Sequence, residues 1–140
     1  MDRLIVHAAL HGAAILLVSL TAGLFTYRAV LRGEPTAAWH LAHAGGSARG
    51  VMLMAVAALA RLPRLPTWEL ALAVWLLIAF SWTSVAAMIV AAATGQRGMT
   101  PRGSPANCIV FLLYVVGGVA VFPAVIVLVA GLLRALGSQV

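Results

Sequence analysis

The chain has 140 residues, of which 64% are hydrophobic and only 9% are charged. Soluble domains are usually about 45–50% apolar and about 25% charged, so this composition is typical of an integral membrane protein in a lipid bilayer. The net charge of +6 comes from arginines that lie mostly at the ends of apolar runs. They form no basic patch with interleaved aromatic residues, which argues against nucleic-acid binding. Cys108 is the only cysteine, which excludes an intrachain disulfide and a multi-cysteine metal site.

Four apolar runs follow one another along the chain, at residues 4–27, 36–62, 68–94 and 107–136. About twenty apolar residues are needed to cross the hydrocarbon core, and helices satisfy their own backbone groups there. We therefore expect an all-α polytopic membrane protein, an antiparallel bundle of four transmembrane helices in a single domain over residues 1–140. The first run superficially resembles a signal peptide, but it leads directly into the second run, so we interpret it as a retained span.

Polar connectors separate these runs. Gly33 and Pro35 are typical of a helix end and a helix start, and the tight turn at residues 61–66 is followed by the interfacial aromatic Trp68. The longest connector, residues 95–105, is expected to reach over one end of the bundle. Four spans place both termini on one membrane side (side A) and the first and third connectors on the other (side B). The arginines divide evenly between the two sides, so the positive-inside rule predicts no orientation.

Polar side chains at membrane depth are costly and therefore mark candidate functional residues. The densest such stretch is residues 39–50, in which His43 and Arg49 lie among very small residues. With a rise of about 1.5 Å per residue, His43, Met88 and Tyr114 all fall roughly 10 Å from side B, on three different helices. We therefore predict that these three side chains occupy one layer and can bind or orient a ligand.

The small residues of this stretch allow two interpretations. Gly46 and Gly50 form a GxxxG pair that permits close helix packing, but a bare surface beside a ligating imidazole would equally admit a flat macrocycle. Arg49 lies near mid-helix, where a charged side chain costs about 2.5–3.5 kcal/mol. The chain offers it no acidic residue at membrane depth, so its partner is a backbone carbonyl, a ligand, water or another subunit. Arg49 is either a ligand-facing group or a structural clamp.

The other histidines fit bundle roles better than ligand roles. His7 and His11 share a face of the first helix near side A, and His11 differs from His43 by roughly 14 Å in depth. This separation disfavours a haem bound between His11 and His43 of one subunit, and we expect His7 and His11 to be hydrogen-bonded bundle residues. His40 lies close to the membrane interface, where it is expected to be a polar flank.

Three stretches resemble the corresponding parts of styrene oxide isomerase, a small four-helix membrane enzyme family of bacterial styrene degradation. They are His11-Gly12, residues 39–52 and residues 95–100. The resemblance implies a homotrimer in the bacterial inner membrane that binds haem b, with His43 matching the axial histidine. It also implies that the ferric iron acts as a Lewis acid on an epoxide, which rearranges to a carbonyl product without net redox change.

From the residues and the resemblance together we predict one site and its occupants. The cofactor site comprises His43, Gly46, Arg49, Gly50 and Met88, with the iron bound by His43, and the catalytic residues are Tyr114 and Arg49. The expected partners are the lipid bilayer, a small lipophilic substrate and further copies of the chain.

Three positions depart from the family pattern. Arg49 stands where the family has a pocket asparagine, Met88 where it has a pocket tyrosine, and Phe80 where it has an aspartate. Tyr114 could take over the orienting role of the missing tyrosine. Two alternatives therefore stay open: a haem-binding electron carrier or sensor without isomerase activity, in which Met88 is the sixth ligand, and a haem-free transporter or assembly subunit. Small drug exporters of this size need a membrane-embedded carboxylate, which this chain lacks.

Overall fold

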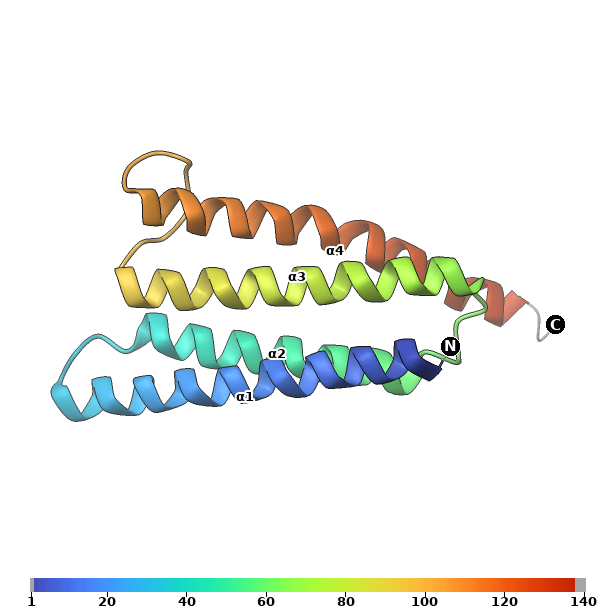
Figure 1. Ribbon diagram of the computed structural model, residues 1–140, viewed down its shortest axis with the longest axis horizontal. Coiled ribbons are helices and arrows are strands. Elements are labelled where there is room, and N and C mark those ends of the chain that lie inside the picture. Colours follow the sequence, from blue (N-terminus) through green and yellow to red (C-terminus); the bar gives the residue numbers. More distant parts are fainter. Residues whose placement is uncertain (1, 138–140) are drawn as a thin grey trace.

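The computed structural model describes residues 2–137, which form four helices and no strand. The helices are α1 (Asp2–Arg32), α2 (Ala37–Leu59), α3 (Thr67–Thr94) and α4 (Pro105–Gly137). They alternate in direction along the chain, and the α1–α2 and α3–α4 connectors lie at one end of the molecule (Figure 1). The prediction of an all-α, membrane-type bundle of four helices is confirmed.

Helix α1 continues past its predicted end at residue 27 to Arg32. Gly33, with a φ of 65°, ends it, and the Gly33 N–H donates to the carbonyl of Val30 at 3.2 Å. The next N–H, of Glu34, donates to the carbonyl of Ala29 at 3.0 Å. A left-handed glycine with such backbone bonds is a common way to terminate a helix. Arg32 thus lies in the last turn, where its charge interacts favourably with the helix dipole.

The four helices form two antiparallel hairpins, α1–α2 and α3–α4. The α2–α3 contacts join the hairpins, supported by fewer contacts between α1 and α3. Among the four helices of residues 2–137, α4 has backbone contacts only with α3, and it lies on the outer side of α3 in Figure 1. Helix α3 is therefore the central element, and the helices form an open layer arrangement.

Glycines bring α1 and α2 into close contact. A Cβ on Gly12 would lie 2.8 Å from the carbonyl oxygen of Gly50, and a Cβ on Gly50 would lie 2.8 Å from that of Gly12. A Cβ on Gly46 would overlap the side chain of Ser19. The GxxxG pair of the second helix is thus used for helix packing within the chain, as one of its two interpretations predicts.

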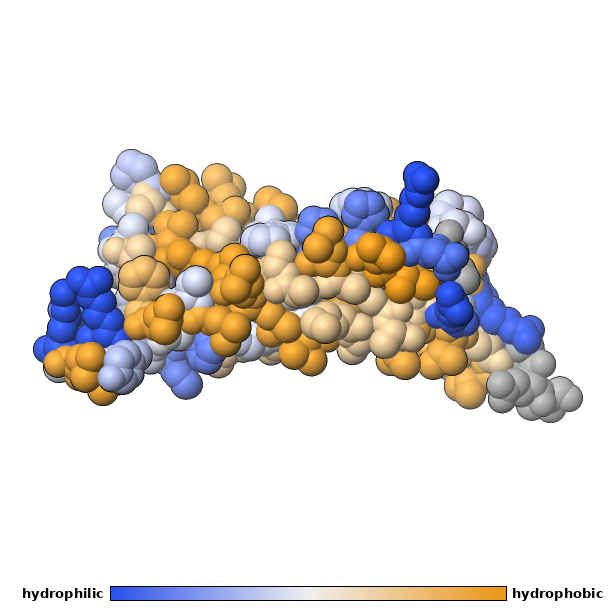
Figure 2. All heavy atoms as spheres, turned by 60° about the horizontal axis from the view of Figure 1, so that its bottom comes forward, coloured by the Kyte–Doolittle hydropathy of each residue, from blue (hydrophilic) through white to orange (hydrophobic). Residues whose placement is uncertain are grey.

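Three helices, α1, α3 and α4, are long and apolar enough to cross a membrane. Of the four transmembrane spans that the sequence predicts, these three are confirmed. Helix α2 lies outside this set, because its histidines, Arg49 and glycines lower its hydropathy. Large apolar side chains such as Leu24 and Phe122 are 68% and 71% exposed, as expected for helix faces that contact lipid. In Figure 2, hydrophobic groups cover most of the length of one face, and hydrophilic groups gather towards its two ends.

Candidate functional site

His43 lies on α2 with its ring against α1. Its Nδ1 is 2.8 Å from the carbonyl oxygen of Ser19. A carbonyl oxygen only accepts hydrogen bonds, so Nδ1–H is the donor, and the neutral imidazole keeps its free lone pair on Nε2. Metal-ligating histidines are commonly oriented in this way, by donating the proton of the other ring nitrogen to a carbonyl. His43 is therefore held in the tautomer that a ligating Nε2 requires.

Two residues of α1 make room for this imidazole, and neither was singled out from the sequence. A Cβ on Gly23 would lie 3.0 Å from the His43 Nδ1. Ser19 is fully buried, and its hydroxyl donates to the carbonyl of Ile15 at 2.8 Å, so the side chain does not compete for His43. The recurrence of small residues at Gly12, Ser19 and Gly23 was the available signal, because these spacings place them on one helix face.

Arg49 is held inside the protein by two contacts. Its Nη1 donates to the carbonyl of Gly45 at 2.9 Å, and its guanidinium carbon lies 5.1 Å from the centre of the Phe80 ring. The first contact is the carbonyl clamp expected of a structural arginine, and the second is a cation–π interaction. Its Nε is buried without a hydrogen-bond partner, and none of the ion pairs between residues 2–137 involves it. The Nε–H of Arg49 is therefore a buried donor without a hydrogen-bond partner among the described residues.

Arg49 and Phe80 are two of the three positions at which the chain departs from the family pattern. The two side chains are in contact, with the guanidinium carbon of Arg49 5.1 Å from the centre of the Phe80 ring. Where the resemblance implies an asparagine and an aspartate, this chain places a guanidinium on an aromatic ring.

Met88 and Tyr114 line one cavity of about 360 Å³ between α2, α3 and α4. The structure thus brings these two predicted site residues together. Tyr114 also lies near Arg49, so the two predicted catalytic side chains are neighbours. The other lining residues are Ala38, Leu41, Ala91, Gln96, Arg97 and Met99.

His43 and Met88 lie on different sides of α2. Met88 is buried and packs on Gly45, where a Cβ would lie 2.8 Å from its Sδ. Gly45 follows His43 by two residues, and at about 100° per residue the two positions face nearly opposite directions. His43 faces α1, as its bond to Ser19 shows. One chain therefore gathers Arg49, Met88 and Tyr114 near α3 and keeps His43 on the other side of α2.

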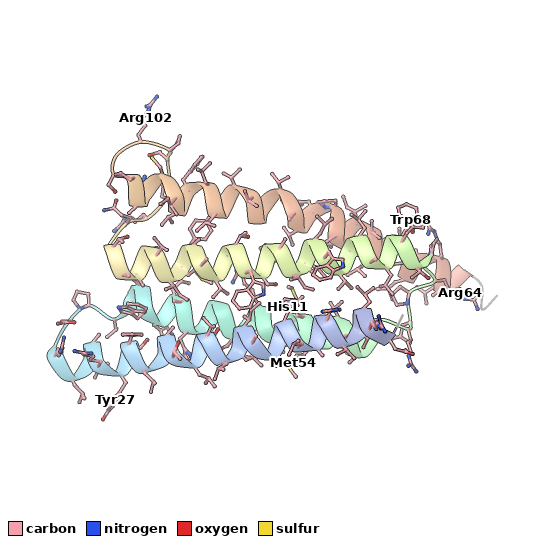
Figure 3. The ribbon with its side chains drawn as sticks, in the orientation of Figure 1. His11, Tyr27, Met54, Arg64, Trp68 and Arg102 are labelled. Carbon is pink, nitrogen blue, oxygen red and sulfur yellow. The ribbon has the colours of Figure 1, made fainter. Side chains whose placement is uncertain are left out.

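His11 points from α1 towards α3 and has a partner there (Figure 3). The indole Nε1–H of Trp82 donates to the Nδ1 of His11 at 3.0 Å. Since Nδ1 accepts, the neutral ring carries its proton on Nε2, the reverse of His43. The His7 ring stacks on that of His11 with 6.3 Å between centroids and lies 5.5 Å from the ring of Trp75. The expectation of a hydrogen-bonded bundle role is confirmed for His11.

The comparisons with known proteins identify the family of the chain. A sequence model of the family described as styrene oxide isomerase matches residues 5–133, which include all of α2 and α3 and most of α1 and α4. A search among curated proteins found no match. The matched range contains all three stretches that carry the resemblance, together with His43 and the cavity beside Met88 and Tyr114. This chain belongs to the styrene oxide isomerase family.

Proposed function

We propose that this protein is an integral membrane isomerase that converts a small lipophilic epoxide to a carbonyl product with haem b bound by His43. The family match supports the isomerase reaction. The observation that carries the haem ligand is the hydrogen bond from His43 Nδ1–H to the Ser19 carbonyl, because it leaves Nε2 free to bind iron. The cellular location that we propose is the bacterial inner membrane.

The residues around His43 fit a planar cofactor. Ala44 and Ser47 flank the histidine on the helix surface and carry little side-chain volume. Gly46 and Gly50, which we predicted to border the cofactor, pack against α1 in the chain. Their contribution would then be indirect, since the close approach of α1 and α2 places the Ser19 carbonyl within reach of the ring.

When bound, haem iron supplies a Lewis acid for the epoxide oxygen. The chain's own groups orient the imidazole of His43 and bind the substrate. Ser19 holds the imidazole through its carbonyl, and the hydroxyl of Tyr114 and the guanidinium N–H groups of Arg49 would be hydrogen-bond donors for a substrate oxygen. The cavity walls are mostly apolar, which would disfavour water beside a reactive epoxide.

A homo-oligomer, and by the resemblance a trimer, is part of this proposal. Within one chain α2 separates His43 from the cavity that Tyr114 lines. A substrate near the iron on His43 would therefore meet a tyrosine in that position only if a neighbouring chain supplied it. Assembly of several copies would also cover the polar His43 face in the membrane.

The electron-carrier alternative cannot draw its sixth ligand from Met88 of the same chain. It needs a second axial ligand, and Met88, the candidate for that role, packs on Gly45 on the far side of α2 from His43.

One spectrum and one assay test the proposed function. Purified protein loaded with haemin is expected to show a high-spin, five-coordinate ferric spectrum and to convert styrene oxide to the aldehyde. A low-spin, six-coordinate spectrum without conversion would instead support the electron carrier. A preparation that stays colourless after haemin is added would contradict both.

A further inference from the structure

The connector between α3 and α4 forms one wall of the cavity. Gln96, Arg97 and Met99 belong to this connector, and they line the cavity together with Ala38 and Leu41 of α2 and with residues of α3 and α4. The expectation that the connector reaches over the end of the bundle is thereby confirmed. We call residues 96–99 the roof of the cavity.

Asn107, in the first turns of α4, ties this connector down. Its Nδ2 donates to the carbonyl oxygens of Thr100 at 2.7 Å and Arg102 at 2.8 Å. Its Oδ1 accepts from the N–H of Gly98, in the roof, at 2.9 Å. Both amide protons and the amide oxygen are thus used, yet Asn107 does not line the cavity. Its amide therefore acts on the cavity only through the connector backbone.

Gly98 packs the roof closely against α4. Its φ of 62° favours glycine, and a Cβ there would overlap the side chain of Val110 and lie 2.9 Å from the backbone nitrogen of Phe111. The connector is anchored at this buried glycine and at the two carbonyls beyond it. Arg102, at the outer edge, points away from the helices (Figure 3). The position of Gln96, Arg97 and Met99 therefore depends on the Asn107 bonds.

The lining indicates what the cavity would bind. Five of the lining residues are alanine, leucine or methionine, and the polar side chains come from Gln96, Arg97 and Tyr114. A volume of about 360 Å³ falls in the range of roughly 300–1,000 Å³ that is common for small-molecule sites. Apolar walls with a few donors fit a small lipophilic molecule that carries one hydrogen-bond-accepting oxygen.

We infer that Asn107 is a positioning residue for such a ligand, because it holds the roof that completes the cavity. The identification of this ligand with the epoxide substrate or its carbonyl product rests on the proposed function. The inference that the cavity binds a small lipophilic molecule with an acceptor oxygen does not depend on the proposed function. The removal of the amide of Asn107 should weaken ligand binding without altering the reacting groups.

The first test measures binding without turnover. Acetophenone and ethylbenzene have similar size, but only acetophenone carries an acceptor oxygen. We expect acetophenone to raise the unfolding temperature of the wild-type protein in nanodiscs more than ethylbenzene does, because a ligand stabilises the state that it binds. Ala91→Phe, which fills the cavity, and Asn107→Ala should lose most of this shift. Ser104→Ala, which removes only the bond to the Asn107 backbone N–H, is the matched control and should keep it.

The second test uses the haem-loaded protein and styrene oxide. Asn107→Ala should raise KM roughly tenfold, while kcat changes by less than about twofold. Asn107→Asp keeps the acceptor for Gly98 and loses both donors, so its KM should lie between those of the wild-type protein and Asn107→Ala. A purely structural role would instead lower the haem content and the unfolding temperature without separating KM from kcat.

The outcomes separate this inference from the proposed function. If the wild-type protein binds acetophenone but does not convert styrene oxide, only the proposed function fails. If it converts styrene oxide while Asn107→Ala and Ala91→Phe keep the wild-type KM and acetophenone shift, the inference is wrong. If Asn107→Ala does not fold, Asn107→Asp decides by the same criteria. The absence of any acetophenone shift in the wild-type protein would also overturn the inference.

Discussion

The imidazole Nδ1–H of His43 donates to the carbonyl oxygen of Ser19, 2.8 Å away on the neighbouring helix. The acceptor is a backbone group, so the orientation of the ring depends on how closely α1 and α2 approach rather than on the Ser19 side chain. The same bond decides which ring nitrogen is available to a metal. The contacts of His43 and of other polar side chains in the bundle lead to four predictions.

His43→Ala is expected to abolish haem retention. It removes the imidazole whose Nδ1–H donates to the Ser19 carbonyl and whose Nε2 is therefore free to bind iron. His7→Ala and His11→Ala should keep most of the haem, since the Nδ1 of His11 is occupied by Trp82 and both lie near side A. The ratio of haem absorbance to protein in purified samples measures the effect. Full haem occupancy in the His43 variant would refute the ligand assignment.

Gly23→Val should reduce haem retention several-fold without preventing membrane insertion. Even a Cβ at this position would lie 3.0 Å from the His43 Nδ1, so the larger side chain must displace the ring. Gly118→Val is the matched control, because a Cβ on Gly118 meets no atom within 4 Å. Haem content is compared at equal amounts of membrane-inserted protein. Equal retention in both variants would show that the ring tolerates displacement.

Arg49→Leu is expected to change haem affinity or substrate turnover far more than membrane insertion, because it removes the guanidinium N–H donors and their positive charge near Tyr114. Phe80→Leu is the companion variant, since it removes the cation–π contact and leaves the guanidinium in place. Phe80→Leu should cost about 0.5–2 kcal/mol of stability with turnover largely retained. If Arg49→Leu lowers only expression and stability, Arg49 is structural.

Trp82→Phe should lower the free energy of unfolding by about 0.5–1.5 kcal/mol, because it removes the indole N–H that donates to His11. Trp75→Phe makes the same chemical change next to His7, where the structure shows a ring contact and no indole hydrogen bond. Trp75→Phe should therefore lower the free energy of unfolding by less than Trp82→Phe does. Chemical denaturation of both variants in the same detergent measures the difference, and haem retention should stay at the wild-type level in both.

The sequence by itself determined the class of protein and the course of the chain. Four helices, their order and the connectors follow from the length and apolar character of each run, and these are local properties. The depth of Met88 and Tyr114 was also predictable, because a helix rises by a constant distance per residue. The end of α1 was wrong by five residues, since the Gly33 cap, and not the first arginine, stops the helix.

Only the tertiary structure decided which side chains face one another. His43 and Met88 share a depth, but the direction of each side chain depends on how the helices pack, and the GxxxG contacts turn His43 towards α1. The Ser19 carbonyl could not be found from residue types, because every residue carries one. The role of Asn107 likewise depends on connector carbonyls that folding brings to it. Residue types mark which groups are costly in lipid, and the packing of α1, α2 and α3 determines what satisfies them.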